Sequence, residues 1–153
     1  MLLIFIANRI YPFGDRSFVV SDMYHQYVPF FRELLGKVRG GESLAFSYEI
    51  GIGSNFMALF VYYLASPLHI FALLVPEKFL IEFMSYLIVV KIGLAGMTAY
   101  IYLRKHFESS DWTALLFSCF YALSGFVCAY NYNIMWMDCV ALAPLVVVGL
   151  ERL

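Results

Sequence analysis

Long apolar runs alternate with short polar breaks along the chain. The clearest run covers residues 79–103, and two more follow at 112–129 and 134–150. Each approaches the roughly 20 apolar residues that a helix needs to cross the hydrocarbon core of a bilayer. We therefore expect three transmembrane helices over these ranges. A shorter run over residues 1–11 ends in turn-forming residues and is expected to be the end of an earlier span.

A further apolar run, residues 57–75, is interrupted near its middle by Ser66 and Pro67. Proline inside a membrane helix removes a backbone hydrogen bond, so neighbouring groups must satisfy the carbonyl that it frees. The run is therefore expected to be either a kinked span or a re-entrant pair of short helices.

An amphipathic helix is expected over residues 21–38, inside an outer loop that covers residues 12–56. Its apolar residues recur at helical spacing and form one face. They are Met23, Tyr27, Phe30, Phe31, Leu34, Leu35 and Val38. Ser21 is the expected N-cap, and Pro29 is expected to kink the helix and to begin its second piece. A helix with one polar and one apolar face typically lies along a membrane surface.

The composition supports an integral membrane protein of the all-α class. Hydrophobic residues make up 63% of the chain and charged residues 14%, against about 25% charged in soluble proteins. A net charge of −1 offers no basic surface for nucleic acid. Because apolar helices reach both ends of the sequence, we expect a fragment of a longer polytopic protein.

The orientation follows from the basic residues, since short cytoplasmic loops are enriched in Lys and Arg. This rule places Arg104, Lys105 and Arg152 inside and residues 130–138 outside. A re-entrant run at 57–75 would put the first loop outside as well. A full crossing would put the two polar regions on opposite sides, and the charge rule favours the re-entrant version.

Two polar clusters are the candidate functional regions, and in the re-entrant version they share one membrane face. They are Asp15, Arg16, Asp22, His25 and Gln26 in the first loop, and Tyr130, Asn131, Asn133, Trp136 and Asp138 in the later turn. A carboxylate at a water–membrane boundary beside a cation is suited to general-base catalysis. Asp22 is the first candidate for that role. The alternative is that its charge only complements a helix N-terminus.

Three further features carry predictions of their own. Lys91 lies within the clearest span, and we expect its ion-pair partner outside this sequence. Asp138, at the mouth of an apolar helix, is also expected to have a partner, because an uncompensated acid is costly there. Gly51 and Gly53 are interpreted as a tight loop, since the surrounding residues lack a nucleotide-binding pattern.

Four segments together resemble the N-terminal part of the YfhO family of bacterial membrane proteins. They are GDRSFVVSDMYHQYVPFF, GIGSNFMALFVYYLASPLHIFALLVPEK, KIGLAG and YALSGFVCAYNYNIMWMDCVALAPLVVVGLERL. They occur in the family's order and spacing and cover nearly the whole chain. The family in turn resembles the GT-C class of glycosyltransferases, so the resemblance implies a GT-C-like N-terminal module in a multi-pass protein of the bacterial cell membrane.

The resemblance also implies a reaction. It implies inverting transfer of a sugar from a polyprenyl-phosphate donor to a cell-envelope acceptor such as teichoic acid, on the outer face. Asp22 matches the family's usual acidic position and would be the general base, and Asp15 is the second candidate. The alternative classes are a lipid or solute transporter or flippase, and a non-catalytic scaffold.

The remaining site residues are assigned to substrate binding. They are Arg16, His25, Gln26, Arg32, Asn131, Asn133, Trp136 and Asp138. The leaving phosphate needs positive charge or a metal, and Arg16, His25 and Arg32 are equal options. No cofactor or metal site is assigned, although a divalent metal held by Asp15, Asp22 or His25 stays an alternative.

Overall fold

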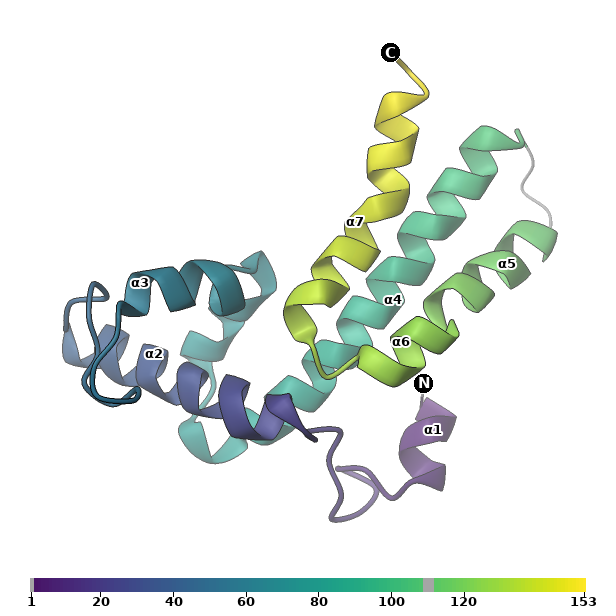
Figure 1. Cartoon of the computed structure of the whole chain (residues 1–153). Coiled ribbons are helices and arrows are strands. Elements are labelled where there is room, and N and C mark those ends of the chain that lie inside the picture. The colour runs from purple at the N-terminus through teal and green to yellow at the C-terminus, as the bar shows by residue number, and fades with distance from the viewer. Residues whose placement is uncertain (1, 109–111) are drawn as a thin grey trace. The chain divides into compact units, whose positions relative to one another are not determined.

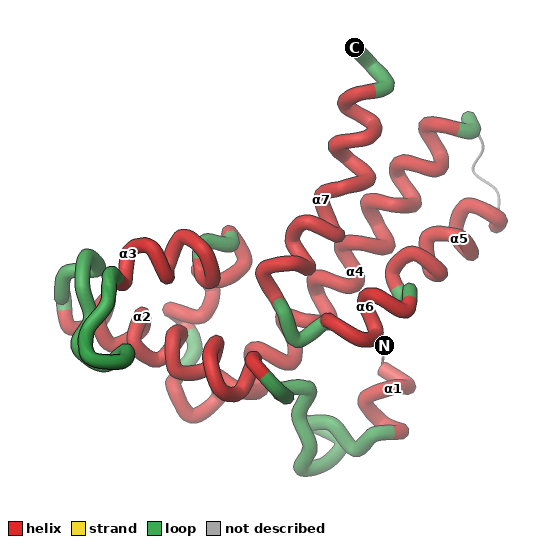
Figure 2. Tube along the Cα trace, viewed as in Figure 1, coloured by secondary structure: helices red, strands yellow, loops and turns green. Residues whose placement is uncertain are grey.

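The computed structural model describes residues 2–108 and 112–153, and it is built of helices and connecting loops (Figures 1 and 2). Helices account for 71% of the chain, and the described ranges contain no strand. The expected all-α class is confirmed. The chain forms two compact units, one up to Ser85 and one from Tyr86 to Leu153, and the boundary falls inside a single long helix.

The first unit consists of short helices around one longer amphipathic helix. In chain order they are α1 (Leu2–Ala7), η1 (Met23–Tyr27), α2 (Val28–Gly40), α3 (Phe56–Leu59), η2 (Phe60–Leu64), η3 (Pro67–Leu74), η4 (Glu77–Phe79) and the start of α4 (Leu80–His106). η1 and η2 are π-helical turns, and η3 and η4 are 3₁₀ turns.

The amphipathic helix forms in two pieces, as its proline predicts. A π-helical turn ends at Tyr27, and α2 begins at Val28, one residue before Pro29. Proline has no backbone N–H to donate, so it is tolerated where a new helical segment begins. The apolar face is buried as expected at Met23, Tyr27, Phe31, Leu34 and Leu35. Val38, predicted on the same face, is exposed.

The prediction that Ser21 caps this helix through its side chain is wrong. Ser21 has a positive φ of 50° and precedes the boundary residue Asp22. Its backbone carbonyl accepts hydrogen bonds from the amides of Tyr24 and His25, at 3.0 and 3.2 Å. The first turn is therefore held by the main chain, because the left-handed backbone at Ser21 aims the carbonyl at those amides.

The apolar run that begins at Met57 is sharply bent. The segments Phe56–Leu64 and Pro67–Leu74 meet at 107°. At the break, the Leu64 carbonyl accepts hydrogen bonds from the Ser66 amide at 2.8 Å and from His69 Nδ1 at 3.0 Å. The predicted interruption at Ser66 and Pro67 is thus present. Whether the bent pair is a broken span or a re-entrant loop stays a prediction.

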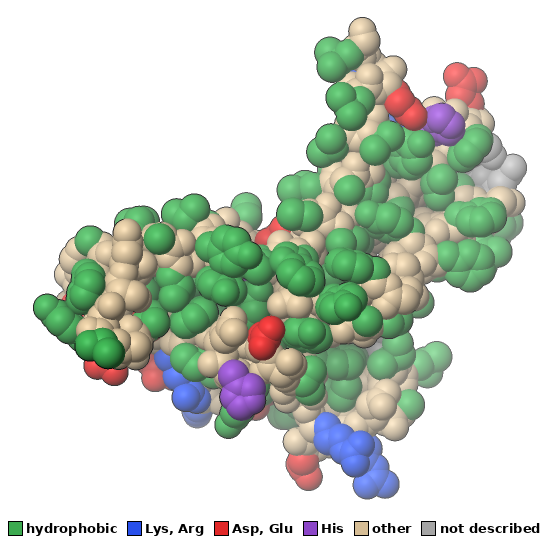
Figure 3. Space-filling model, viewed as in Figure 1, with side chains coloured by type: hydrophobic (Ala, Val, Ile, Leu, Met, Phe, Trp, Pro, Cys, Tyr) green, Lys and Arg blue, Asp and Glu red, His purple; other side chains and the backbone are tan. Residues whose placement is uncertain are grey.

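The second unit contains the rest of α4 together with α5 (Trp112–Ala122), α6 (Gly125–Tyr130) and α7 (Ile134–Leu150). Glu77–His106 and Trp112–Tyr130 are long and apolar enough to cross a membrane, the bent pair is a third candidate, and α7 is an apolar helix of 17 residues. On the face shown in Figure 3, hydrophobic side chains cover most of the surface over these helices. These features support contact with a lipid bilayer.

The predicted helix over residues 112–129 contains a break that its sequence pattern does not show. α5 ends at Ala122 and α6 begins at Gly125, with Ser124 as the N-cap of α6. The Ser124 side chain accepts a hydrogen bond from the Val127 amide at 3.5 Å. Serine competes with the backbone for hydrogen bonds, which makes it a good cap and a poor interior residue.

Small residues bring α4 and α5 close together. Ala95 and Ala99 are buried, and a Cβ added to Gly96 would lie 3.2 Å from Cβ of Ala122. Small residues at a helix crossing let two membrane helices approach closely. Ala95, Gly96 and Ala99 thus give α4 a small-residue face. Gly93 of the same helix faces open space, since an added Cβ would meet nothing within 4 Å outside its own helix backbone.

A tyrosine on α5 satisfies the carbonyl that Pro144 frees within α7. Proline cannot donate to the carbonyl four residues earlier, which here belongs to Val140. The hydroxyl of Tyr121 donates a hydrogen bond to that carbonyl at 2.7 Å. Polar groups from a neighbouring helix commonly satisfy such carbonyls in membrane proteins.

We expect Gly96→Leu to destabilise the second unit by about 1–3 kcal/mol, because the side chain would force α4 and α5 apart. Gly93→Leu is the matched control, since it makes the same change on the same helix in open space. Unfolding of the detergent-solubilised protein by SDS measures both variants. Equal stability of the two variants would contradict close packing at Gly96.

We expect Tyr121→Phe to cost about 0.6–2 kcal/mol, the range found for hydrogen bonds between membrane helices. The reason is that Val140 then loses its donor. In a Pro144→Ala background the backbone supplies a donor, so Tyr121→Phe should cost much less. The same SDS titration applied to the four proteins of this cycle measures the difference. An equal cost in both backgrounds would exclude the link to Pro144.

Candidate functional site

Asp22 is an exposed carboxylate at the entry to the amphipathic helix. It lies directly before η1, and its side chain makes no capping hydrogen bond to the first turn. Its charge is therefore not used by a helix cap, although it still lies near the positive end of the helix dipole. The carboxylate is open to a substrate hydroxyl.

Two polar side chains follow Asp22 within the first helical turn. His25 is exposed, and its ring meets the ring of Tyr24 edge to face, with 5.4 Å between the ring centroids. Gln26 is half-buried. The π-helical turn thus places an imidazole and an amide three and four residues after Asp22, the candidate base.

The loop before the helix presents Asp15 and Arg16, both exposed. The loop is closed by backbone hydrogen bonds from the Tyr11 amide to the Arg16 carbonyl at 2.9 Å and from the Arg16 amide to the Arg9 carbonyl at 3.1 Å. Gly14 is needed for this closure, because an added Cβ would lie 2.5 Å from the Arg9 carbonyl oxygen. The closed loop therefore presents the acid Asp15 next to the cation Arg16 at its closing end.

Arg32 lies apart from Asp22 and lines a polar groove. It follows Asp22 by ten residues, which is about 15 Å along a helix axis. The groove has a volume of about 600 Å³. Its lining consists of Pro29, Arg32, Glu33, Gly36, Lys37, Glu42, Tyr48, Glu49 and Ile50. Arg32 thus lies farther along the helix from Asp22 than His25, which follows Asp22 by three residues.

A buried lysine lines this polar groove and pairs with two of its carboxylates. Lys37 is 7% exposed, and its ammonium lies 3.5 Å from carboxylate oxygens of both Glu33 and Glu42. Glu33 also accepts a hydrogen bond from the hydroxyl of Ser47. The two carboxylates are held in place by these contacts, and the exposed charged residues of the groove are Arg32, Glu42 and Glu49.

A second groove, which is apolar, lies against the other flank of α2. Its volume is about 670 Å³. Its lining consists of Leu34, Val38, Leu44, Phe60, Leu64, Ala65, Ser66, Pro67, His69, Ile70 and Leu73. The amphipathic helix therefore has a polar groove beside its polar face and an apolar groove beside its apolar face.

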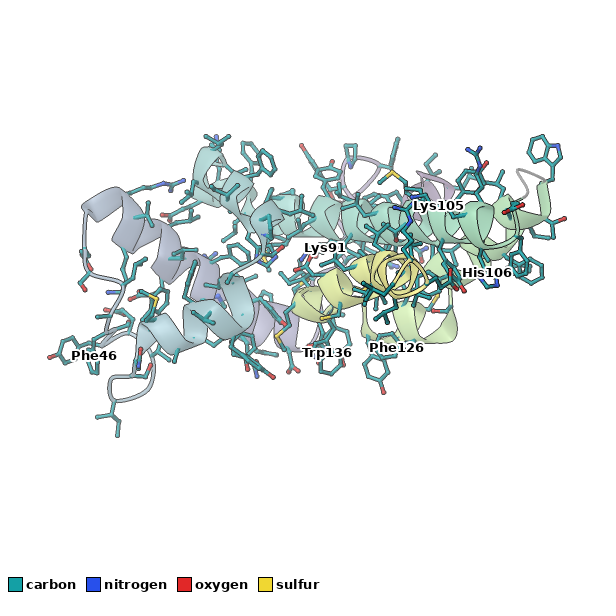
Figure 4. The ribbon with its side chains drawn as sticks, turned by 90° about the horizontal axis from the view of Figure 1, so that it is seen from above. Phe46, Lys91, Lys105, His106, Phe126 and Trp136 are labelled. Carbon is teal, nitrogen blue, oxygen red and sulfur yellow. The ribbon has the colours of Figure 1, made fainter. Side chains whose placement is uncertain are left out.

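In the second unit, Lys91 and Asp138 form an ion pair, which corrects the expectation that Lys91 pairs with a residue outside this sequence. Lys91, labelled in Figure 4, is fully buried. Its Nζ lies 2.9 Å from Asp138 Oδ1. The same ammonium donates a hydrogen bond to the carbonyl of Ile134 at 2.8 Å. The expectation that Asp138 has a partner is confirmed. Burying an unpaired charge is costly, which explains why the two are paired.

The turn between α6 and α7 carries the other predicted residues of this cluster. Asn131 binds back to the end of α6, donating to the carbonyls of Val127 and Cys128 at 3.1 and 3.0 Å. Asn133 is 7% exposed and lies at the start of α7. Trp136 is partly exposed and stacks on Phe126, with 6.5 Å between the ring centroids (Figure 4).

A second pair fixes the register between α4 and α7 near their C-terminal ends. His106 Nδ1 lies 2.8 Å from Glu151 Oε1. His106 follows Lys91 by fifteen residues and Glu151 follows Asp138 by thirteen, which is about 22 and 20 Å of helix. Two pairs with matched spacing hold these helices side by side in the same direction.

The two predicted polar clusters lie in different units of the structure. Asp15 with Arg16, and Asp22 with His25 and Gln26, belong to the first unit, and residues 131–138 belong to the second. The placement of both clusters on one membrane face stays a prediction. Among the residues that the structure describes, no three His, Cys, Asp or Glu side chains gather as metal ligands.

The pairing of Lys91 was the main feature that sequence reasoning missed. A signal was available, because Lys91 is the only cation in the run 79–103 and Asp138 the only charged residue in the run 134–150. Opposite charges in two apolar helices of one chain are candidates for each other's partner. The Tyr121 hydroxyl carried no comparable signal, because aromatic residues are frequent throughout the chain.

The helical fold, the apolar spans and the ion pair buried between helices define a helical membrane protein. Comparison with protein families matches residues 1–153 to the family described as bacterial membrane protein YfhO. The chain belongs to the YfhO family. Comparison with curated proteins and with solved structures gives no match.

We expect Lys91→Met to destabilise the protein by about 2–3 kcal/mol, because Asp138 is then left without its partner. The value lies below that of a fully buried pair because the Asp138 side chain is 28% exposed. The double replacement Lys91→Met/Asp138→Leu removes both charges and should recover most of the loss. Lys105→Met is the control on an exposed position of the same helix. SDS titration measures all four proteins, and a double variant as unstable as the single one would contradict the pairing.

Proposed function

We propose that this protein is a membrane glycosyltransferase of the GT-C type. It transfers a sugar from a polyprenyl-phosphate donor to a cell-envelope acceptor, such as teichoic acid, at the outer face of the bacterial cell membrane. The observation that carries the proposal is the position of Asp22. It is an exposed, uncapped carboxylate at the start of an amphipathic helix, in a chain of the YfhO family.

Asp22 acts as the general base in this proposal. It takes the proton of an acceptor hydroxyl while the oxygen attacks the anomeric carbon from the face opposite the lipid phosphate. The new bond to the acceptor oxygen forms as the bond to the phosphate oxygen breaks, and the electron pair leaves with the phosphate. A single displacement of this kind inverts the anomeric centre.

The two grooves beside α2 suit the two substrates of this reaction. A polyprenyl chain is hydrocarbon and fits the apolar groove, which runs between α2 and the bent helix pair. An acceptor rich in hydroxyl and phosphate groups fits the polar groove. The polar groove offers Arg32 for phosphate and carboxylates for hydroxyls, and the Tyr48 ring is 83% exposed beside them. The helix that follows Asp22 would thus hold the donor's lipid chain and the acceptor on its two flanks.

Positive charge for the leaving phosphate comes from Arg16 or His25 in this arrangement. Both belong to the same unit as Asp22, and both are exposed. Arg32 is better assigned to the acceptor, since it lines the polar groove. Cationic groups that are aimed at developing phosphate charge lower the barrier for phosphate departure.

A transporter or flippase is the second candidate. The observation in its favour is the presence of broken helices, at the 107° bend and between α5 and α6. Transporters often bind their cargo at such breaks near the bilayer midplane. The charges inside the spans argue for the transferase, because Lys91 and Asp138 neutralise each other. Among the described residues, the other acids lie in loops, near helix ends or, for Glu33, in the amphipathic helix α2.

We expect Asp22→Asn to lower sugar transfer by about 10²–10⁴-fold, the usual contribution of a general base. Protein abundance and membrane insertion should not change, because Asp22 is exposed and makes no capping bond. Membranes from expressing cells, supplied with a radiolabelled polyprenyl-phosphate sugar and teichoic acid, provide the assay. Asp15→Asn is the matched comparison at the second acidic candidate.

Two results would count against this proposal. One is full transfer by both Asp22→Asn and Asp15→Asn. The other is labelling of a cysteine at position 24 but not at position 130 by an impermeant reagent added from outside. Tyr24 and Tyr130 are both exposed, so a failure to label would reflect membrane side and not burial. Cys119, Cys128 and Cys139 are free and exposed, so the labelling needs them replaced by alanine.

A further inference from the structure

We propose that Lys91 is a positioning residue, which holds the turn between α6 and α7 in place from inside the bilayer. Its ammonium binds two groups one helical turn apart on α7, the Ile134 carbonyl at 2.8 Å and the Asp138 carboxylate at 2.9 Å. Both groups lie at the start of α7, directly after the turn. The lysine therefore acts on the end of the helix that carries the candidate site residues.

Hydrogen bonds and ring contacts link the residues of the turn to the first turn of α7, which Lys91 holds. The Asn133 amide donates to the Tyr130 carbonyl, and the Trp136 amide donates to the Asn133 carbonyl, both at 2.9 Å. The Trp136 ring also contacts the rings of Phe126 and Tyr130. A shift in the first turn of α7 would move these groups together. Asn133 and Trp136 thus depend on a lysine that lies on another helix.

This assignment changes the role of Asp138. One of its carboxylate oxygens is engaged by a fully buried ammonium, so the group serves the protein's own structure. Asp138 is then a second positioning residue and not a ligand for substrate. The effect on sugar transfer rests on the proposed function, whereas the effect on the turn does not.

The chain contains a built-in reporter for the turn. Trp112 and Trp136 are its two tryptophans, so Trp112→Phe leaves Trp136 as the sole source of tryptophan fluorescence. Trp112 is 85% exposed at the start of α5, and its replacement removes little packing. The emission and acrylamide quenching of the purified Trp112→Phe chain in nanodiscs then report the surroundings of Trp136.

In that background we expect Lys91→Met to increase acrylamide quenching of Trp136 about twofold, because loss of both bonds shifts the turn toward open conformations. Lys91→Arg should restore quenching to near the parent value, since arginine also donates to a carbonyl and a carboxylate. Lys105→Met, an exposed lysine of the same helix, should leave quenching unchanged. Unchanged quenching in a folded Lys91→Met protein would overturn the proposal.

The double variant Lys91→Met/Asp138→Leu covers the case in which Lys91→Met does not fold. It leaves no unpaired charge in the membrane but still lacks the bond to Ile134, so quenching should again rise. Unchanged quenching in this variant would overturn the proposal as well. Transfer assays separate the two hypotheses, because an inactive parent with a responsive Trp136 contradicts only the proposed function. An active parent with an unresponsive Trp136 contradicts only the role of Lys91.

Discussion

A charge or a backbone carbonyl without an ion-pair or hydrogen-bond partner is unfavourable in the hydrocarbon of a bilayer. Contact with lipid does not compensate for the missing partner. The second unit meets this constraint twice. The Tyr121 hydroxyl satisfies the carbonyl that Pro144 frees, and the Lys91 ammonium pairs with Asp138. Both bonds join α7 to another helix. The polar groups that the membrane would penalise are therefore the ones that determine how these helices pack.

The same constraint shapes the bend in the first unit. The helix there stops at Leu64, and the carbonyl at its end is bound by the Ser66 amide and by buried His69. Because a carbonyl only accepts, the Nδ1 atom of His69 carries the proton in this bond. The bend is thus held by a defined polar contact. It places the broken helix beside α2 and so forms one wall of the apolar groove.

In the proposed transferase, α2 would lie between the sites for two substrates of opposite character, one apolar and one polar. The apolar face of this helix is buried, while exposed polar residues extend along its other face from Asp22 to Arg32. Lys37 fixes Glu33 and Glu42 at the polar groove, where unpaired carboxylates would repel each other. An acceptor with hydroxyl and phosphate groups and a lipid donor would then meet along the helix that carries the proposed base.

The residue pattern alone determined the all-α membrane class, the helix that changes at Pro29 and the interruption at Ser66 and Pro67, because these features depend on local hydrogen bonding and on hydrophobic period. It also indicated Asp22 as a candidate. Only the tertiary structure decided the partner of Lys91 and the donor for the carbonyl that Pro144 frees. These contacts join residues 19 and 47 positions apart, and their geometry depends on how whole helices pack, which no local spacing encodes.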